Sequence, residues 1–120
     1  MNWPRKLGII LAAAIAVLLG LAAILPAELA GTYVSDGGEV EHALGLAIIA
    51  FLVTVSYPRA WAWVLGLGTV ASLAVEMVQP IFGRDSQWID LAASVAGLVI
   101  GVSAALSVAG LVRRYLRSRQ

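Results

Sequence analysis

Two acidic and two neutral polar side chains lie near the ends of neighbouring apolar segments in the second half of the chain. Glu76 and Gln79 are three residues apart and Asp90 and Ser94 are four apart, so each pair occupies one face of a helix. Ionisable groups at a membrane boundary are expensive, and they are usually paired, turned toward other helices and functional. The sequence therefore predicts one polar site at such a boundary, built from two helices.

The chemistry of this site depends first on Glu76. It lies near the C-terminal end of an apolar helix, where the helix dipole disfavours an anion, so it requires a cationic partner, a proton or a ligand. Arg84 is the nearest cation in the sequence. A carboxyl group partly removed from water can act as a general acid or base, with Asp90 or His42 as its partner. Glu76, Asp90 and His42 are therefore the candidate catalytic residues.

The same residues can instead bind a ligand without any reaction. Arg84 is suited to bidentate contacts with a phosphate or carboxylate, while Gln79 and Ser94 supply neutral hydrogen bonds. Glu76 and Asp90 would orient Arg84 or accept hydrogen bonds from sugar hydroxyls. The candidate ligand-binding residues are Glu76, Gln79, Arg84, Asp90, Ser94 and His42.

Purely structural explanations stay open for these residues. An acid in the first turn of a helix is stabilised by about 0.3–1 kcal/mol through the helix dipole, which can explain Asp90 by itself. A Glu76–Arg84–Asp90 cluster can serve only to stabilise the fold. His42 can be a hydrogen-bonded polar side chain at the membrane interface with no catalytic role. We expect no metal and no cofactor, since the chain has no cysteine and a single histidine.

The elements that position these residues are predicted to be membrane helices. An apolar fraction of 61%, a charged fraction of 12% and a mean hydropathy of +0.92 exclude an ordinary soluble domain. The apolar segments are too long and continuous for barrel strands, which leaves helices. We predict one all-α domain over residues 1–120, a bundle of four transmembrane helices at about 7–27, 41–57, 60–79 and 87–112.

The second apolar segment, 43–57, is short for a membrane span. Its helix should therefore begin earlier and draw Glu41 and His42 toward the membrane. The turn that follows is expected to be tight, because Pro58 ends the helix.

The distribution of basic residues predicts the orientation. If four helices cross the membrane, one side carries Arg5, Lys6, Arg59, Arg113, Arg114, Arg117 and Arg119. The opposite side carries only Arg84. The positive-inside rule then places both termini in the cytoplasm and the polar site on the outer side.

Small residues on one helix face predict how the bundle packs. Asp90, Ser94, Gly97, Gly101 and Ala105 share a face of the fourth predicted helix, and small residues allow close approach of another helix. We expect the helix at 60–79 to pack against the helix at 87–112, with the polar ends of both helices facing each other. Small-residue faces can also support homo- or hetero-oligomers.

With these residues in place, the chain resembles the VanZ-like family of small membrane proteins. The resemblance covers about His42 to Gly101: a histidine at the start of the second helix, Glu76-x-x-Gln79, Arg84, and Asp90 followed by Ser94 and two glycines. The chain has Gly38-Glu39 where the family often has Asp-Lys, and Ser94 where asparagine is usual. The family is named for a protein linked to teicoplanin resistance. The resemblance implies a bacterial cytoplasmic-membrane protein with a link to glycopeptide resistance, and it supplies no reaction.

Four functions are compatible with these features. The leading hypothesis is a site that binds the headgroup of a membrane lipid or lipid-linked envelope intermediate, with no nucleic-acid partner. The second is an enzyme that uses Glu76 and Asp90 for acid–base hydrolysis or group transfer on such a lipid. A small exporter is disfavoured, because the charge bias sets one orientation and Glu76 lies away from the midplane. The fourth is an accessory subunit of an envelope complex.

Overall fold

The structure is a computed structural model that describes residues 3–24, 38–82 and 88–120. Within these residues the chain is helical and contains no strand. The helices are α1 (Trp3–Ile24), α3 (Gly38–Ser56), α4 (Trp61–Val78) and α5 (Trp88–Arg117), with short 3-10 turns η2 (Pro58–Ala60) and η3 (Gln79–Phe82). The predicted all-helical fold with four helices is confirmed.

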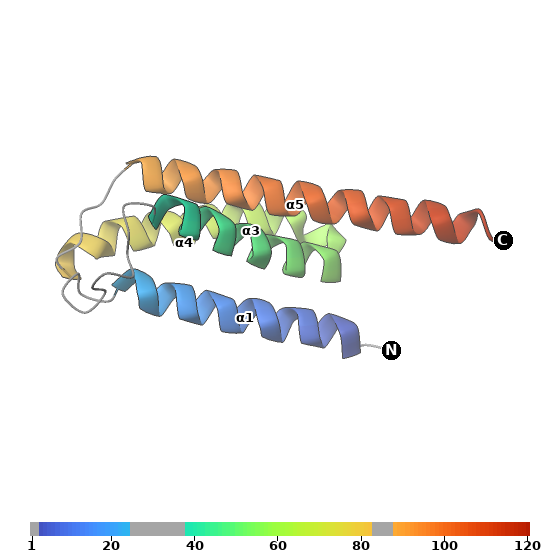
Figure 1. Ribbon diagram of the computed structural model, residues 1–120, viewed down its shortest axis with the longest axis horizontal. Helices are drawn as coiled ribbons and strands as arrows, with labels where there is room; N and C mark the ends of the chain where they lie inside the picture. Colours follow the sequence, from blue (N-terminus) through green and yellow to red (C-terminus); the bar gives the residue numbers. More distant parts are fainter. Residues whose placement is uncertain (1–2, 25–37, 83–87) are drawn as a thin grey trace.

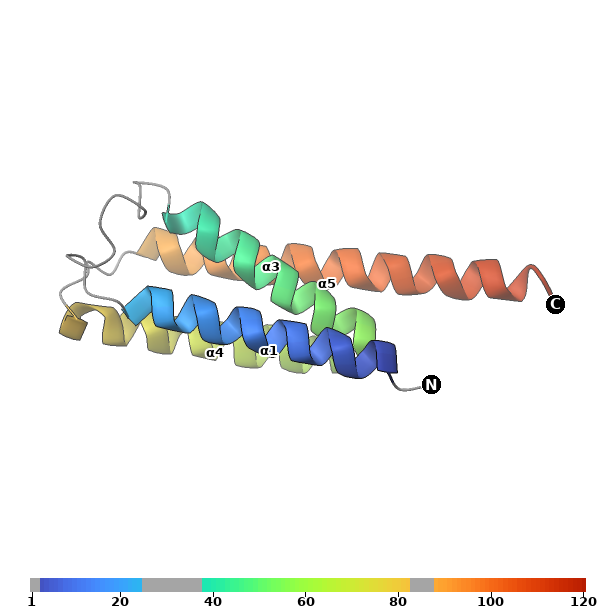
Figure 2. The ribbon, with the colours of Figure 1, turned by 60° about the horizontal axis from the view of Figure 1, so that its bottom comes forward.

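The four helices alternate in direction and form an elongated bundle of 58 × 26 × 23 Å (Figure 1). The start of α1 and the end of α5 lie toward the same end, and α5 extends beyond the other helices there (Figure 2). Arg5 supports this arrangement independently, because its guanidinium lies 5.9 Å from the centre of the Tyr57 ring at the turn between α3 and α4. The bundle therefore has one end that holds the termini and one end that holds the polar site residues.

Among the described residues, three helical stretches are long and apolar enough to cross a membrane: Pro4–Leu21, Pro58–Ile81 and Trp88–Arg117. The apolar stretch of α3, Val40–Ser56, is shorter. The helix α3 itself begins at Gly38, which confirms that the second helix starts ahead of its apolar segment. Glu41 and His42 are consequently held on the first two turns of a helix.

Two predicted helix limits differ from the structure by more than three residues. The helix α1 begins at Trp3, earlier than residue 7, and its predicted last residues lie outside the described part of the chain. The helix α5 continues to Arg117, past the predicted end at 112, because residues 111–117 contain good helix formers and no glycine or proline. Its 30 residues correspond to about 45 Å, against about 30 Å for the hydrocarbon core of a bilayer.

The closest helix contact joins α3 and α5. A Cβ atom added to Gly97 would collide with the carbonyl oxygen of Ala43, and one added to Gly101 would collide with that of Ala47. The glycine face of α5 therefore receives α3, a partner that the sequence left open, whereas the predicted packing of the helix at 60–79 on the last helix is confirmed by the contact between α4 and α5. The face packs on α3 because α3 presents small residues, including Ala50, at matching positions.

The helix α4 also packs on α5, but through a different surface. Gly68 of α4 lies against the side chain of Leu98, which is 1% exposed. The buried apolar cluster consists of Ala50, Leu98 and Val102, with Leu46, Val64 and Leu65 packed around it. Most large apolar side chains instead face outward, which is the distribution expected of helices surrounded by lipid.

Candidate functional site

A pocket of about 160 Å³ lies between the four helices toward the end of the bundle opposite the termini. Four polar residues line it: His42 from α3, Ser72 and Glu76 from α4, and Ser94 from α5. The rest of the lining is apolar or glycine: Ala16, Leu19, Gly20, Leu46, Ile49, Ala71 and Val75. The pocket therefore combines a small polar group of side chains with an apolar wall.

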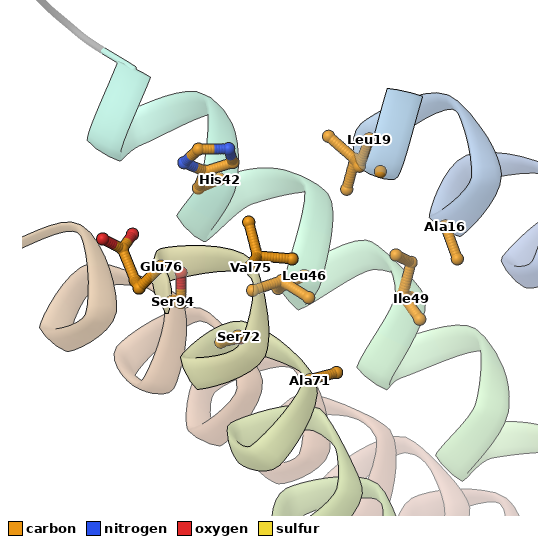
Figure 3. A pocket seen from close by; sticks show the side chains of 11 residues that line it. Ala16, Leu19, His42, Leu46, Ile49, Ala71, Ser72, Val75, Glu76 and Ser94 are labelled. Carbon is orange, nitrogen blue, oxygen red and sulfur yellow. The ribbon is translucent and has the colours of Figure 1, made fainter. Parts of the chain in front are cut away.

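Three residues chosen from the sequence meet at this pocket although they come from three helices (Figure 3). Glu76 lies in the last turn of α4, Ser94 in the second turn of α5, and His42 in the second turn of α3. The alternating helix directions bring these three turns to the same end of the bundle. Glu76 and Ser94 are buried, at 9% and 6% exposed, and His42 is partly buried.

The helix α1 and Ser72 contribute to the pocket but were not among the predicted site residues. Ser72 belongs to the polar stripe that also includes Thr69, Glu76 and Gln79, so its spacing was a usable signal. Its hydroxyl donates to the carbonyl oxygen of Gly68 at 2.8 Å, which leaves the hydroxyl oxygen able to accept a hydrogen bond. The signal on α1 was weaker: small residues at 12, 16 and 20 indicate a close-packing face and nothing polar.

Gln79 is buried beside the pocket but does not line it. Its side chain is 2% exposed, and its Oε1 atom has no hydrogen-bond partner among the described residues. A buried amide oxygen without a partner costs about 1–3 kcal/mol. Gln79 follows Glu76 by one turn, so this acceptor lies next to the polar end of the pocket.

Asp90 is separated from the pocket by one helical turn. It lies in the first turn of α5, is partly exposed, and is absent from the described pocket lining. This is the position in which the helix dipole favours an acid. Asp90 therefore has a local structural explanation in the helix dipole.

The predicted contacts of Arg84 lie outside the described residues, so its pairing with Glu76, Asp90 or a ligand stays a prediction. The described residues contain no group of three histidine, cysteine, aspartate or glutamate side chains placed to hold a metal ion. What the described site offers is a carboxyl group, an imidazole and two hydroxyls facing an apolar pocket. These groups can hold a polar head by hydrogen bonds and charge, and the first two can exchange protons.

Comparison with protein-family models, with curated proteins and with solved structures gives no match for this chain. The VanZ-like resemblance therefore rests on the order and spacing of residues in this sequence alone.

Proposed function

We propose that this chain is a bacterial membrane protein of the VanZ-like type whose outward-facing pocket binds the headgroup of a cell-envelope lipid or glycolipid. One observation carries the proposal: His42, Glu76 and Ser94 stand together at one end of a pocket whose other lining residues, apart from Ser72, are apolar or glycine. A lipid has the same division between a polar head and a hydrocarbon part. A soluble polar metabolite would match only a small part of this lining.

The proposed topology has four membrane crossings, with both termini in the cytoplasm. The end of the bundle that holds the termini also carries Arg5, Lys6 and Arg59, whereas the pocket lies toward the other end. Basic residues accumulate on the cytoplasmic side of membrane proteins, so the pocket faces outward in this topology. The short apolar stretch of α3 then places His42 close to the outer boundary of the hydrocarbon region.

In the proposed complex, each polar group has a separate role toward the headgroup. Glu76 accepts hydrogen bonds from hydroxyl or ammonium groups, and the Ser94 hydroxyl donates to a phosphate or carbonyl oxygen. The His42 imidazole does either, depending on its protonation state. Arg84 is the residue that the sequence offers as a phosphate ligand, and glycopeptide resistance is the biological context that the resemblance suggests.

The alternative is an enzyme at the same site. One observation favours it: the carboxyl group of Glu76 and the imidazole of His42 line one pocket, so an acid and a base can act on the same bound molecule. Hydrolysis or group transfer on a lipid-linked substrate would then follow binding. Turnover of lipid-linked substrates by the wild type, abolished by both Glu76→Gln and His42→Ala, would establish this alternative.

The proposal is tested by native mass spectrometry of the protein purified in mild detergent. We expect the wild type to retain a selected envelope lipid, and Glu76→Gln and Arg84→Ala to lose it by about tenfold, as for loss of a charge-assisted hydrogen bond. Glu41→Gln is the matched control, because Glu41 is an exposed acid adjacent to His42. Helix content by circular dichroism verifies that each variant is folded.

A wild type that retains no selected lipid would overturn the proposal. If Glu76→Gln also lost the folded state, the polar cluster around Glu76 would serve to stabilise the fold. The accessory-subunit hypothesis would then replace lipid binding.

A further inference from the structure

We propose that the apolar part of the pocket is a slot for one hydrocarbon chain of the bound lipid, and that this chain enters sideways from the membrane between α1 and α4. The inference rests on the proposed function and narrows its ligand class. The ligand becomes a membrane-resident amphiphile with a hydrocarbon chain next to its headgroup. A water-soluble headgroup fragment would lack the group that fills the slot.

The pocket opens on the side of the bundle. Ala16 of α1 and Ala71 of α4 both line it, and both are exposed, so they stand at its mouth. Ala71 precedes the end of α4 by seven residues, or about 10 Å of helix, and Ala16 precedes the end of α1 by eight residues, or about 12 Å. Each lies in a stretch apolar enough to cross a membrane. The mouth is therefore at the depth where lipid hydrocarbon chains lie.

The helices on either side of this mouth are loosely associated. Within the described part of the chain, α1 runs along α3 but touches α4 at few points. Figure 3 shows Ala16 and Leu19 on α1 well apart from Ala71 on α4, with Ile49 of α3 between them in this view. A seam between two weakly packed helices can admit a chain without breaking the tight α3–α5 contact.

The pocket face of α3 connects the polar end of the slot to its opening between α1 and α4. His42, Leu46 and Ile49 follow one another on the pocket face of α3 and span about 10 Å. A molecule whose polar group meets His42, Glu76 and Ser94 would therefore place its first chain carbons against Leu46 and Ile49. This order matches an amphiphile lying parallel to the helices, with its head toward the bundle end.

Gly20 leaves room for a larger group at the pocket lining. Gly20 lines the pocket, and a Cβ atom added there would meet no described atom within 4 Å. An apolar recess that opens into lipid has no ordered water to fill it, and an unfilled recess forfeits van der Waals contacts along its lining. Hydrocarbon is the filler that the surroundings supply.

The test fills the slot from the protein side. The protein is placed in vesicles of phosphatidylethanolamine and phosphatidylglycerol that contain a lipid with a photoreactive diazirine midway along one chain, and labelled residues are mapped by mass spectrometry. In the wild type we expect labelling of the slot residues on α1 and α4. Gly20→Leu should lower this labelling by about tenfold, the effect of overfilling an occupied site.

Matched variants keep the test interpretable. Gly66→Leu on α4 adds the same side chain where a Cβ also meets no described atom, but away from the pocket, and should leave slot labelling unchanged. Ala71→Leu fills the slot from the opposite helix and should reproduce the effect of Gly20→Leu. This second variant guards against a folding defect specific to α1.

The outcomes separate this inference from the proposed function. If Glu76→Gln abolishes lipid retention while Gly20→Leu and Ala71→Leu leave slot labelling intact, the headgroup site stands and the slot is overturned. If no variant changes either readout, both proposals fail. If Gly20→Leu instead dissolves a dimer in which Ala71 crosslinks to a second copy, a partner helix fills the seam and the slot is overturned.

Discussion

Gly97 of α5 lies directly against the main-chain carbonyl group of Ala43 in α3, next to His42 in the sequence. Ser94 precedes Gly97 by three residues, so the same contact that brings the two backbones together also brings Ser94 and His42 into the lining of one pocket. The geometry of the polar site therefore depends on Gly97, a residue with no functional group of its own.

We expect Gly97→Ala to destabilise the fold by about 1–3 kcal/mol, because the new methyl group meets backbone atoms that cannot turn aside. Unfolding by SDS titration in mixed micelles measures the change. Gly110→Ala is the control on the same helix, since a Cβ at that position meets no described atom. It should be neutral or stabilising by about 0.5–1 kcal/mol from helix propensity. Equal effects of the two variants would contradict the close α3–α5 contact.

The stability of Gly68→Ala should lie between those of Gly97→Ala and Gly110→Ala. Its added methyl group would come within 2.7 Å of Leu98 Cδ2, which is the end of a side chain that can adopt another rotamer. We expect a loss of about 1 kcal/mol, below that of Gly97→Ala, in the same SDS titration. A loss larger than that of Gly97→Ala would mean that α4–α5 packing is the more rigid contact.

Gln79→Met should stabilise the ligand-free protein. The substitution removes a buried amide whose oxygen has no described partner and keeps a similar side-chain volume, so about 1–3 kcal/mol is recovered. Thermal unfolding of delipidated protein measures this shift. A destabilised Gln79→Met would show that the amide is already satisfied in the ligand-free state, by water or by residues outside the described part of the chain.

The topology can be read with single cysteines, because the natural chain has none. Ile81→Cys is expected to react with a membrane-impermeant maleimide in intact cells, since Ile81 is 78% exposed in η3, just after α4, and lies outside in the proposed topology. Arg59→Cys and Ser118→Cys should react only after permeabilisation. If α3 failed to cross the membrane, Arg59→Cys would be labelled from outside and Ile81→Cys would be protected.

The helices and the polar end of the bundle were predictable because they depend on local properties. Apolar runs predict helices, and the spacing of Glu76 and of Ser94 identifies the helix faces that carry polar groups. The start of α3 ahead of its apolar segment was also predictable, because that segment is short for a membrane span. These features depend on residues within a few turns of one another, so the sequence by itself determined them.

The choice of partner for each helix face was decided only by the tertiary structure. The glycines at 97 and 101 predicted a close contact, but α3 and α4 both offered apolar surfaces for it. In a lipid environment no hydrophobic gain separates such candidates, so the match of small residues and backbone shape decides between them. That match placed α3 on α5 and left α1 loosely against α4. The participation of Gly20 in the pocket follows from this packing, since the small residues of its helix indicate only a close-packing face in the sequence.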